Sequence, residues 1–184
     1  SYTVRMANGA LSTATVTVNI TGTNDLASIS GDTEGSVTED GTLATGGTLT
    51  VSDLDHDQSS FQLVDDAALT GAYGGFTFDS NTGEWDFVGN NGAETQSLWE
   101  DEEAVQTLVV KSLDGTDEET ITVTIKGVND VAIFEGTDDG SVTEDGTQTT
   151  GGTLTVNDKD HDQSGFKPVE DAALALVEEH LKGK

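Results

Sequence analysis

Hydrophobic and polar residues alternate along several short stretches of the chain. Between positions 48 and 52, Leu49 and Val51 fall on one face, with threonine and serine on the other. Between positions 119 and 126, three β-branched hydrophobic residues alternate with three threonines: Ile121, Val123 and Ile125 against Thr120, Thr122 and Thr124. Alternation with a period of two predicts β-strands that turn one face towards a core. Further strands are expected at 36–38 and 105–111.

A hairpin is expected between positions 75 and 88. Its turn, 79–83, reads Asp-Ser-Asn-Thr-Gly, and the asparagine and the glycine suit the positive φ angles that tight turns require. Two aromatic residues lie on each arm, and together with Phe61 they are expected to anchor the core: Phe76, Phe78, Trp85 and Phe87.

The number and spacing of these stretches predict the fold class. About seven short strands in roughly 105 residues are typical of an Ig-like β-sandwich. The acidic composition, with 33% hydrophobic residues, would also suit a disordered chain. The regular alternation of threonine with valine and isoleucine argues against disorder, and 22 glycines against a single proline, Pro168, suit many short strands joined by turns. We therefore expect an all-β protein.

The sequence repeats itself at an offset of 105 residues. Residues 26–70 and 131–175 are identical at 29 of 45 positions, and 15–25 matches 120–130 at the same offset. A fixed period of this kind indicates tandem modules. We expect 1–25 to be the C-terminal strands of one module, 26–130 a complete module, and 131–174 the N-terminal part of a third. Residues 175–184 leave the repeat and are either a turn or two of helix or an appended, irregular tail.

Charge and composition exclude several classes of partner. The chain carries 35 acidic residues against 7 Lys and Arg, a formal net charge of −28, which disfavours nucleic acid and anionic membrane surfaces. No run of 18 apolar residues is present, so membrane insertion is not expected. The absence of cysteine excludes disulfides and thiolate metal sites.

The acidic residues gather at the expected module ends, in three motifs that each occur twice. These are Asn24-Asp25 and Asn129-Asp130, Glu39-Asp40 and Glu144-Asp145, and Asp53-x-Asp55-x-Asp57 and Asp158-x-Asp160-x-Asp162. Carboxylates that converge repel one another unless a cation lies between them. Ca²⁺, which takes 6–8 oxygen ligands, suits such a cluster better than Mg²⁺. The alternative is that these loops only keep the surface solvated.

Two other kinds of site fit the sequence less well. The Asp-x-Asp loop is not an EF-hand, since Gln58 stands in place of the glycine and Val64 in place of the bidentate glutamate. Paired acids could act on a glycosidic bond, with His56 and His161 as bases, but an active site copied into every module is implausible. We do not expect an enzyme.

These motifs resemble the VCBS-type repeats of large bacterial RTX-like surface adhesins, which are cadherin-like in fold. The resemblance rests on 21–25 (TGTND), 35–41 (GSVTEDG), 48–55 (TLTVSDLD) and the stretch from Tyr73-Gly-Gly-Phe to Gly-Glu-Trp85, and it covers nearly the whole chain. It implies tandem cadherin-like sandwiches with calcium between consecutive modules.

The resemblance also implies a ligand set for each junction. One junction would use Asn24, Asp25, Asp53 and Asp55, with Asp114 as a partner from a late turn. The other would use Glu39, Asn129, Asp130, Asp158 and Asp160, with Asp101. Asp57 and Asp162 would either bind the ion or support the residues that do. Trp99 departs from the pattern of animal cadherins, which have an acidic residue there.

The resemblance finally implies a function and a location. The chain would be a calcium-stabilised extender of a long, type I-secreted, extracellular adhesin on the bacterial surface, used in adhesion or biofilm formation. Its partners would be calcium and neighbouring repeats of the same chain, with other cells or surface glycans bound by other regions. The alternative is a module that itself binds a glycan or mediates homophilic contact between cells.

Overall fold

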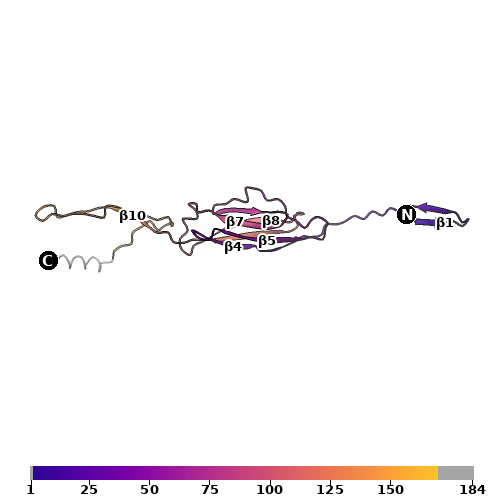
Figure 1. The fold of residues 1–184 in the computed structure, drawn as a ribbon, viewed down its shortest axis with the longest axis horizontal. Coiled ribbons are helices and arrows are strands. Elements are labelled where there is room, and N and C mark those ends of the chain that lie inside the picture. The colour runs from indigo at the N-terminus through magenta and orange to yellow at the C-terminus, as the bar shows by residue number, and fades with distance from the viewer. Residues whose placement is uncertain (1, 170–184) are drawn as a thin grey trace.

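The computed structural model describes residues 2–169, and every regular element in this range is a β-strand. Figure 1 shows an elongated molecule in which two packed sheets lie between two separate hairpins. In the described part of the chain, no helix is long and apolar enough to cross a membrane. The expectations for residues 170–174 and for the tail at 175–184 fall outside the described residues.

Residues 26–130, called the central module below, form two sheets. One sheet is antiparallel, in the order β3 (Ser28–Gly31), β5 (Ala44–Ser52), β7 (Glu84–Gly89) and β6 (Gly74–Phe78). The other has the order β4 (Glu34–Thr38), β9 (Glu118–Lys126) and β8 (Glu103–Lys111), with β4 parallel and β8 antiparallel to β9. The expected all-β sandwich is therefore confirmed.

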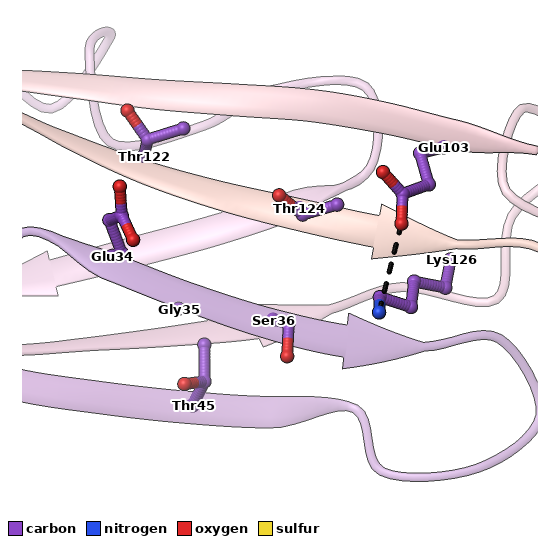
Figure 2. A pocket seen from close by; sticks show the side chains of 8 residues that line it. All are labelled: Glu34, Gly35, Ser36, Thr45, Glu103, Thr122, Thr124 and Lys126. Carbon is purple, nitrogen blue, oxygen red and sulfur yellow. Dashed lines mark ion pairs between the residues drawn. The ribbon is translucent and has the colours of Figure 1, made fainter.

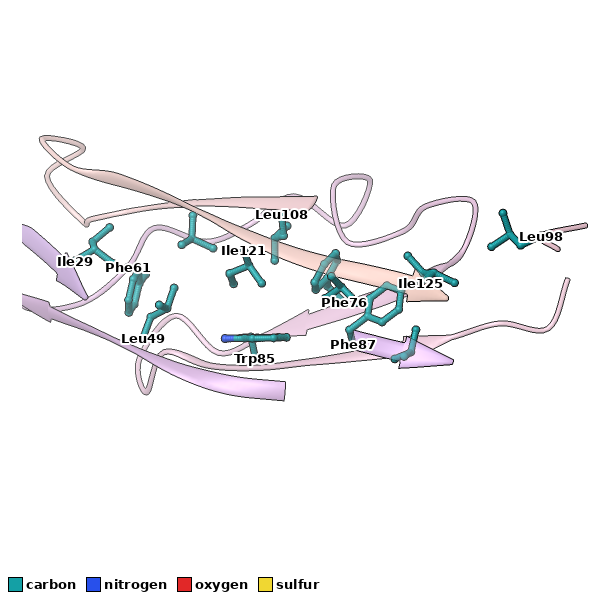
Figure 3. Close-up of a cluster of buried hydrophobic side chains, with 13 residues drawn as sticks. Ile29, Leu49, Phe61, Phe76, Trp85, Phe87, Leu98, Leu108, Ile121 and Ile125 are labelled. Carbon is teal, nitrogen blue, oxygen red and sulfur yellow. The ribbon is translucent and has the colours of Figure 1, made fainter. Parts of the chain in front are cut away.

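The core lies between these two sheets (Figure 3). Its centre is the pair of aromatic side chains of β7, Trp85 and Phe87, both fully buried, with the ring of Phe76 4.9 Å from that of Phe87. The indole N–H of Trp85 donates to the backbone carbonyl of Asp32 at 2.8 Å, which satisfies its one polar atom. From β9, the expected inward residues are all buried: Ile121, Val123 and Ile125.

Three details of the central module differ from the sequence expectations. β5 begins at Ala44 rather than at 48, and β3 was not predicted because it contains a single hydrophobic residue, Ile29. In the hairpin turn, only Gly83 has a positive φ, of 74°. Asn81 does not; its backbone N–H instead donates to Asp79 Oδ1 at 2.8 Å.

The two outer hairpins are related differently to the central module. The hairpin of β10 (Ile133–Gly136) and β11 (Leu154–Asn157) repeats the pairing of β3 with β5 at an offset of 105 residues in both strands. The hairpin of β1 (Tyr2–Arg5) and β2 (Leu11–Ala14) is exposed throughout. Residues 15–25 match part of β9 in sequence but form no strand, since β9 is flanked by β4 and β8, and residues 2–27 contain no counterpart of β4.

Candidate metal centre

Carboxylates of the Asp-x-Asp loop that follows β11 accept the backbone hydrogen bonds that hold this loop in place. Asp158 Oδ1 accepts a hydrogen bond from the backbone N–H of Asp160 at 3.1 Å, and Asp160 Oδ2 accepts one from the backbone N–H of Asp130 at 3.1 Å. The second bond ties the loop to the Asn129-Asp130 segment, called the linker below. Both bonds recur 105 positions earlier, at 2.8 Å each, among Asp53, Asp55 and Asp25.

The Asp-x-Asp loops and the Glu-Asp turns share an uncommon backbone conformation, with an aspartate at positive φ in each. Asp57 and Asp162 both have φ of 62°, and Asp40 and Asp145 have φ of 51° and 59°. Aspartate is one of the few residues that enter the left-handed region at moderate cost. The repeated acidic motifs therefore adopt the same local fold in both copies.

At the junction that follows the central module, the carboxylate of Glu39 is buried. Glu39 comes directly after β4 and is only 1% exposed. Gln96 Nε2 donates to its Oε1 at 2.8 Å, and the backbone N–H of Val128 donates to its Oε2 at 3.0 Å. Burial raises the pKa of Glu39, as do the nearby carboxylates of Asp130, Asp40 and Asp160, while the N–H of Val128 opposes the rise.

Three acidic side chains meet at this point from two different segments. Glu39, Asp40 and Asp130 each offer an oxygen, and these oxygens all lie within 4.8 Å of one another. Asp130 Oδ2 and Asp160 Oδ1 are buried without a hydrogen-bond partner, and Asp160 as a whole is 1% exposed. Buried carboxylate oxygens without a donor are costly. The donor set consists only of oxygens, so these residues fit a hard cation such as Ca²⁺.

The junction that precedes the central module contains the same loop but fewer acids. Asn24 Nδ2 donates to Asp114 Oδ2 at 2.9 Å, and Asp53 Oδ2 is buried without a partner. The hydrogen bond from Asn24, with others from Ser112 and Thr116, lowers the pKa of Asp114. Residues 2–27 supply no counterpart of Glu39, so in the described residues this junction lacks the buried glutamate of the other.

The remaining expected ligands are not among the three acids whose oxygens converge in the described residues. Asp57 and Asp162 are exposed, and Asn129 Nδ2 donates to the carbonyl of Asp130 at 2.6 Å. Asp101 is exposed in a left-handed turn and lines a small pocket with Thr38 and Lys126. Glu144 and Asp145, the copies of Glu39 and Asp40, are exposed.

Two residues that sequence reasoning missed take part in the junction. Gln96 Nε2 donates to Glu39 and also to Asp40 Oδ1, at 3.1 Å. Glu102, next to the expected Asp101, contacts His161 at 2.8 Å. The acidic run at 100–103 indicated that this region could supply a ligand, but no pattern in it distinguishes Glu102 from Asp101. No sequence pattern indicates a role for Gln96.

A shallow groove crosses the open face of the three-stranded sheet (Figure 2). Lys126 and Glu103 form an ion pair of 3.7 Å at one end. The rest is lined by β4, β9 and the edge of β5, with these residues: Glu34, Gly35, Ser36, Thr45, Thr122 and Thr124. None of its lining residues is aromatic. The groove therefore lacks the ring that would support the alternative of glycan binding.

No family model matches the chain, and no curated protein matches it.

Proposed function

We propose that this chain is a calcium-stabilised structural extender, in which Ca²⁺ at the junctions between consecutive β-sandwich modules stiffens a long extracellular protein. The observation that carries the proposal is the pair of buried carboxylate oxygens without a hydrogen-bond partner, on Asp130 and Asp160, beside the cluster of Glu39, Asp40 and Asp130. Such oxygens are strongly destabilising unless a cation shares them.

The ligands would come from both sides of a module boundary. Glu39, Asp40 and Asp130 belong to the central module, with Asp130 as its last residue, and Asp158 and Asp160 belong to the segment that follows. An ion bound there supplies positive charge that offsets the repulsion among these carboxylates. Because its ligands belong to two modules, binding restrains the angle between them.

The expected strength of calcium binding suits an extracellular setting for this role. Extracellular modules bind calcium with Kd of roughly 10⁻⁴–10⁻³ M, which suits the calcium levels outside cells. With its resemblance to VCBS-type repeats, this favours a place in the stalk of a bacterial surface adhesin exported by type I secretion, with neighbouring repeats as its partners. No specific observation favours a glycan-binding or homophilic role for this chain.

Thermal unfolding with and without calcium tests the proposal. If free calcium exceeds Kd about a hundredfold, binding adds roughly 2.7 kcal/mol per site. We expect excess Ca²⁺ to raise the melting temperature by many degrees, while Mg²⁺ at the same concentration has a much smaller effect and a chelator reverses the change. Equal melting temperatures in calcium and in chelator would refute it.

A further inference from the structure

The segment that follows the linker also contacts the central module through two side chains that are not carboxylates, Lys159 and His161. Lys159 lies between the two aspartates of the Asp-x-Asp loop, and its Nζ is 3.2 Å from Asp130 Oδ1. The same ammonium group donates to Oε1 of Gln96. Gln96 in turn donates to Glu39 and Asp40 through its Nε2. One amide side chain therefore connects the lysine of one segment with the acids of the other.

His161 makes a second set of contacts with the loop between β7 and β8. Its ring lies against that of Trp99, with centroids 4.3 Å apart and planes 32° apart. Its Nε2 is 2.8 Å from Glu102 Oε2, and its backbone N–H donates to the carbonyl of Ser97 at 3.0 Å. An aromatic contact, a charge-assisted hydrogen bond and a backbone hydrogen bond thus converge on one residue.

We propose that residues 96–102 form a docking surface for the Asp-x-Asp-His loop of the following module, and that Lys159 and His161 hold this loop in place without metal. The loop's own groups here are an ammonium and a backbone N–H, which have no lone pair to offer a cation, and an imidazole whose two nitrogens face Asp162 and Glu102. The docking contacts therefore form without an ion, although Gln96 and Lys159 also touch the acids of the proposed calcium site.

The earlier copy of the loop provides a comparison. His56 occupies the position of His161, yet its side chain is 92% exposed and contacts only its neighbour Asp57, at 2.7 Å. Leu54 occupies the position of Lys159 and is 87% exposed. The described residues place no counterpart of Trp99 or Gln96 beside this copy. The contacts of Lys159 and His161 therefore require the surface at 96–102 and do not arise from the loop alone.

The difference between Leu54 and Lys159 at equivalent positions implies that residues 96–102 bind one copy of the loop better than the other. Gln96 Oε1 accepts a hydrogen bond from Lys159, which a leucine at that position could not donate. A module whose loop carries lysine would dock more firmly than one with leucine, while the histidine contact would be common to both. The kind of partner that fits 96–102 is thus an Asp-Lys-Asp-His loop.

Distance measurements in a chelator test this proposal, because the cysteine-free chain accepts label sites cleanly. Spin labels are attached at two exposed positions, Thr107→Cys on β8 and Thr155→Cys on β11. The distance between them reports how widely the orientation of the β10–β11 hairpin varies relative to the central module. We expect Trp99→Ala and His161→Ala each to broaden the distance distribution about twofold, since each removes the aromatic contact. Lys159→Leu should broaden it less.

The matched control is His56→Ala, which alters the copy of the loop that makes no such contact and should leave the distribution unchanged. If the unaltered chain in chelator is already as broad as His161→Ala, the docking proposal is wrong. Calcium added afterwards separates the two proposals. If docking persists in chelator but calcium changes neither the distribution nor the melting temperature, the calcium proposal fails and the docking proposal stands.

Discussion

Asp160 and Asp130 are joined by a hydrogen bond of 3.1 Å from the backbone N–H of Asp130 to Oδ2 of Asp160. Each of these residues also has a carboxylate oxygen that is buried without a partner. The side chain of Asp160 thus holds the linker in place through one oxygen and adds a buried negative charge beside it through the other. Substitutions at this position can separate the two effects.

Replacing Asp160 by asparagine or by alanine should give different results in chelator. Asparagine keeps an oxygen that accepts from the N–H of Asp130, so its melting temperature should stay close to that of the unaltered chain. Alanine leaves that N–H without its acceptor and should cost about 1–3 kcal/mol. Both should lose most of the calcium-induced rise. Calorimetry in chelator and in excess calcium measures both effects, and a full calcium response in Asp160→Ala would contradict the proposed ligand set.

Asp40→Asn should remove charge from the cluster without disturbing its geometry. Asparagine tolerates the left-handed conformation of Asp40, and its oxygen can accept the hydrogen bonds that Asn91 and Gln96 now donate. We expect a smaller calcium-induced rise in melting temperature and a slightly more stable metal-free chain, by up to about 1 kcal/mol. Asp145→Asn, at the copied position, is the control and should change neither value.

Gly83→Ala should strongly destabilise the central module. Gly83 has a φ of 74°, and a Cβ added there would lie 2.0 Å from the carbonyl oxygen of Leu49. The backbone of β5 would have to move, and we expect a loss of more than about 2 kcal/mol in the free energy of unfolding. Gly151→Ala, which has open space around its Cβ position, is the comparison. Similar denaturant midpoints for the two variants would contradict this account.

Asp79 should make the hairpin sensitive to acid. A hydrogen bond from the backbone N–H of Asn81 lowers the pKa of Asp79, with weaker help from Thr82. A depressed pKa means that the ionised group stabilises the folded state above its unfolded pKa, and that this contribution is lost as the pH falls through the folded pKa. Asp79→Ala should therefore melt a few degrees lower at neutral pH, and the difference should vanish in strong acid. A difference that persists unchanged at low pH would point to another cause.

Much of the sandwich could be predicted from the sequence because its inner faces follow a period of two. Ile121, Val123 and Ile125 are buried as that pattern requires. β3 was missed because its pairing with β5 depends on long-range contact, and the only hydrophobic residue in Ser28–Gly31 is Ile29. The alternation of hydrophobic and polar residues within a segment cannot predict a strand whose stability comes mainly from the neighbouring strand.

The junction was predicted in part for a similar reason. The repeated Asn-Asp and Asp-x-Asp motifs identified the linker and the loop, which the structure places in contact through Asp130 and Asp160. Gln96 comes from an irregular loop and is neither acidic nor repeated in the chain, so no pattern marked it. Lys159 and His161 were visible in the sequence, but their partners became apparent only when the loop between β7 and β8 was placed beside them.

The parallel pairing of β4 with β9 determines how the central module responds to pulling. The chain enters this module at one end and leaves it at the other (Figure 1). Tension would draw β4 towards its own start and β9 towards its own end, so the two parallel strands would be sheared along their length. The ladder from Glu34–Thr122 to Thr38–Lys126 would then have to yield as a unit rather than one bond at a time. We therefore expect the module to resist stretching along the axis of the chain more strongly than it resists peeling of one strand.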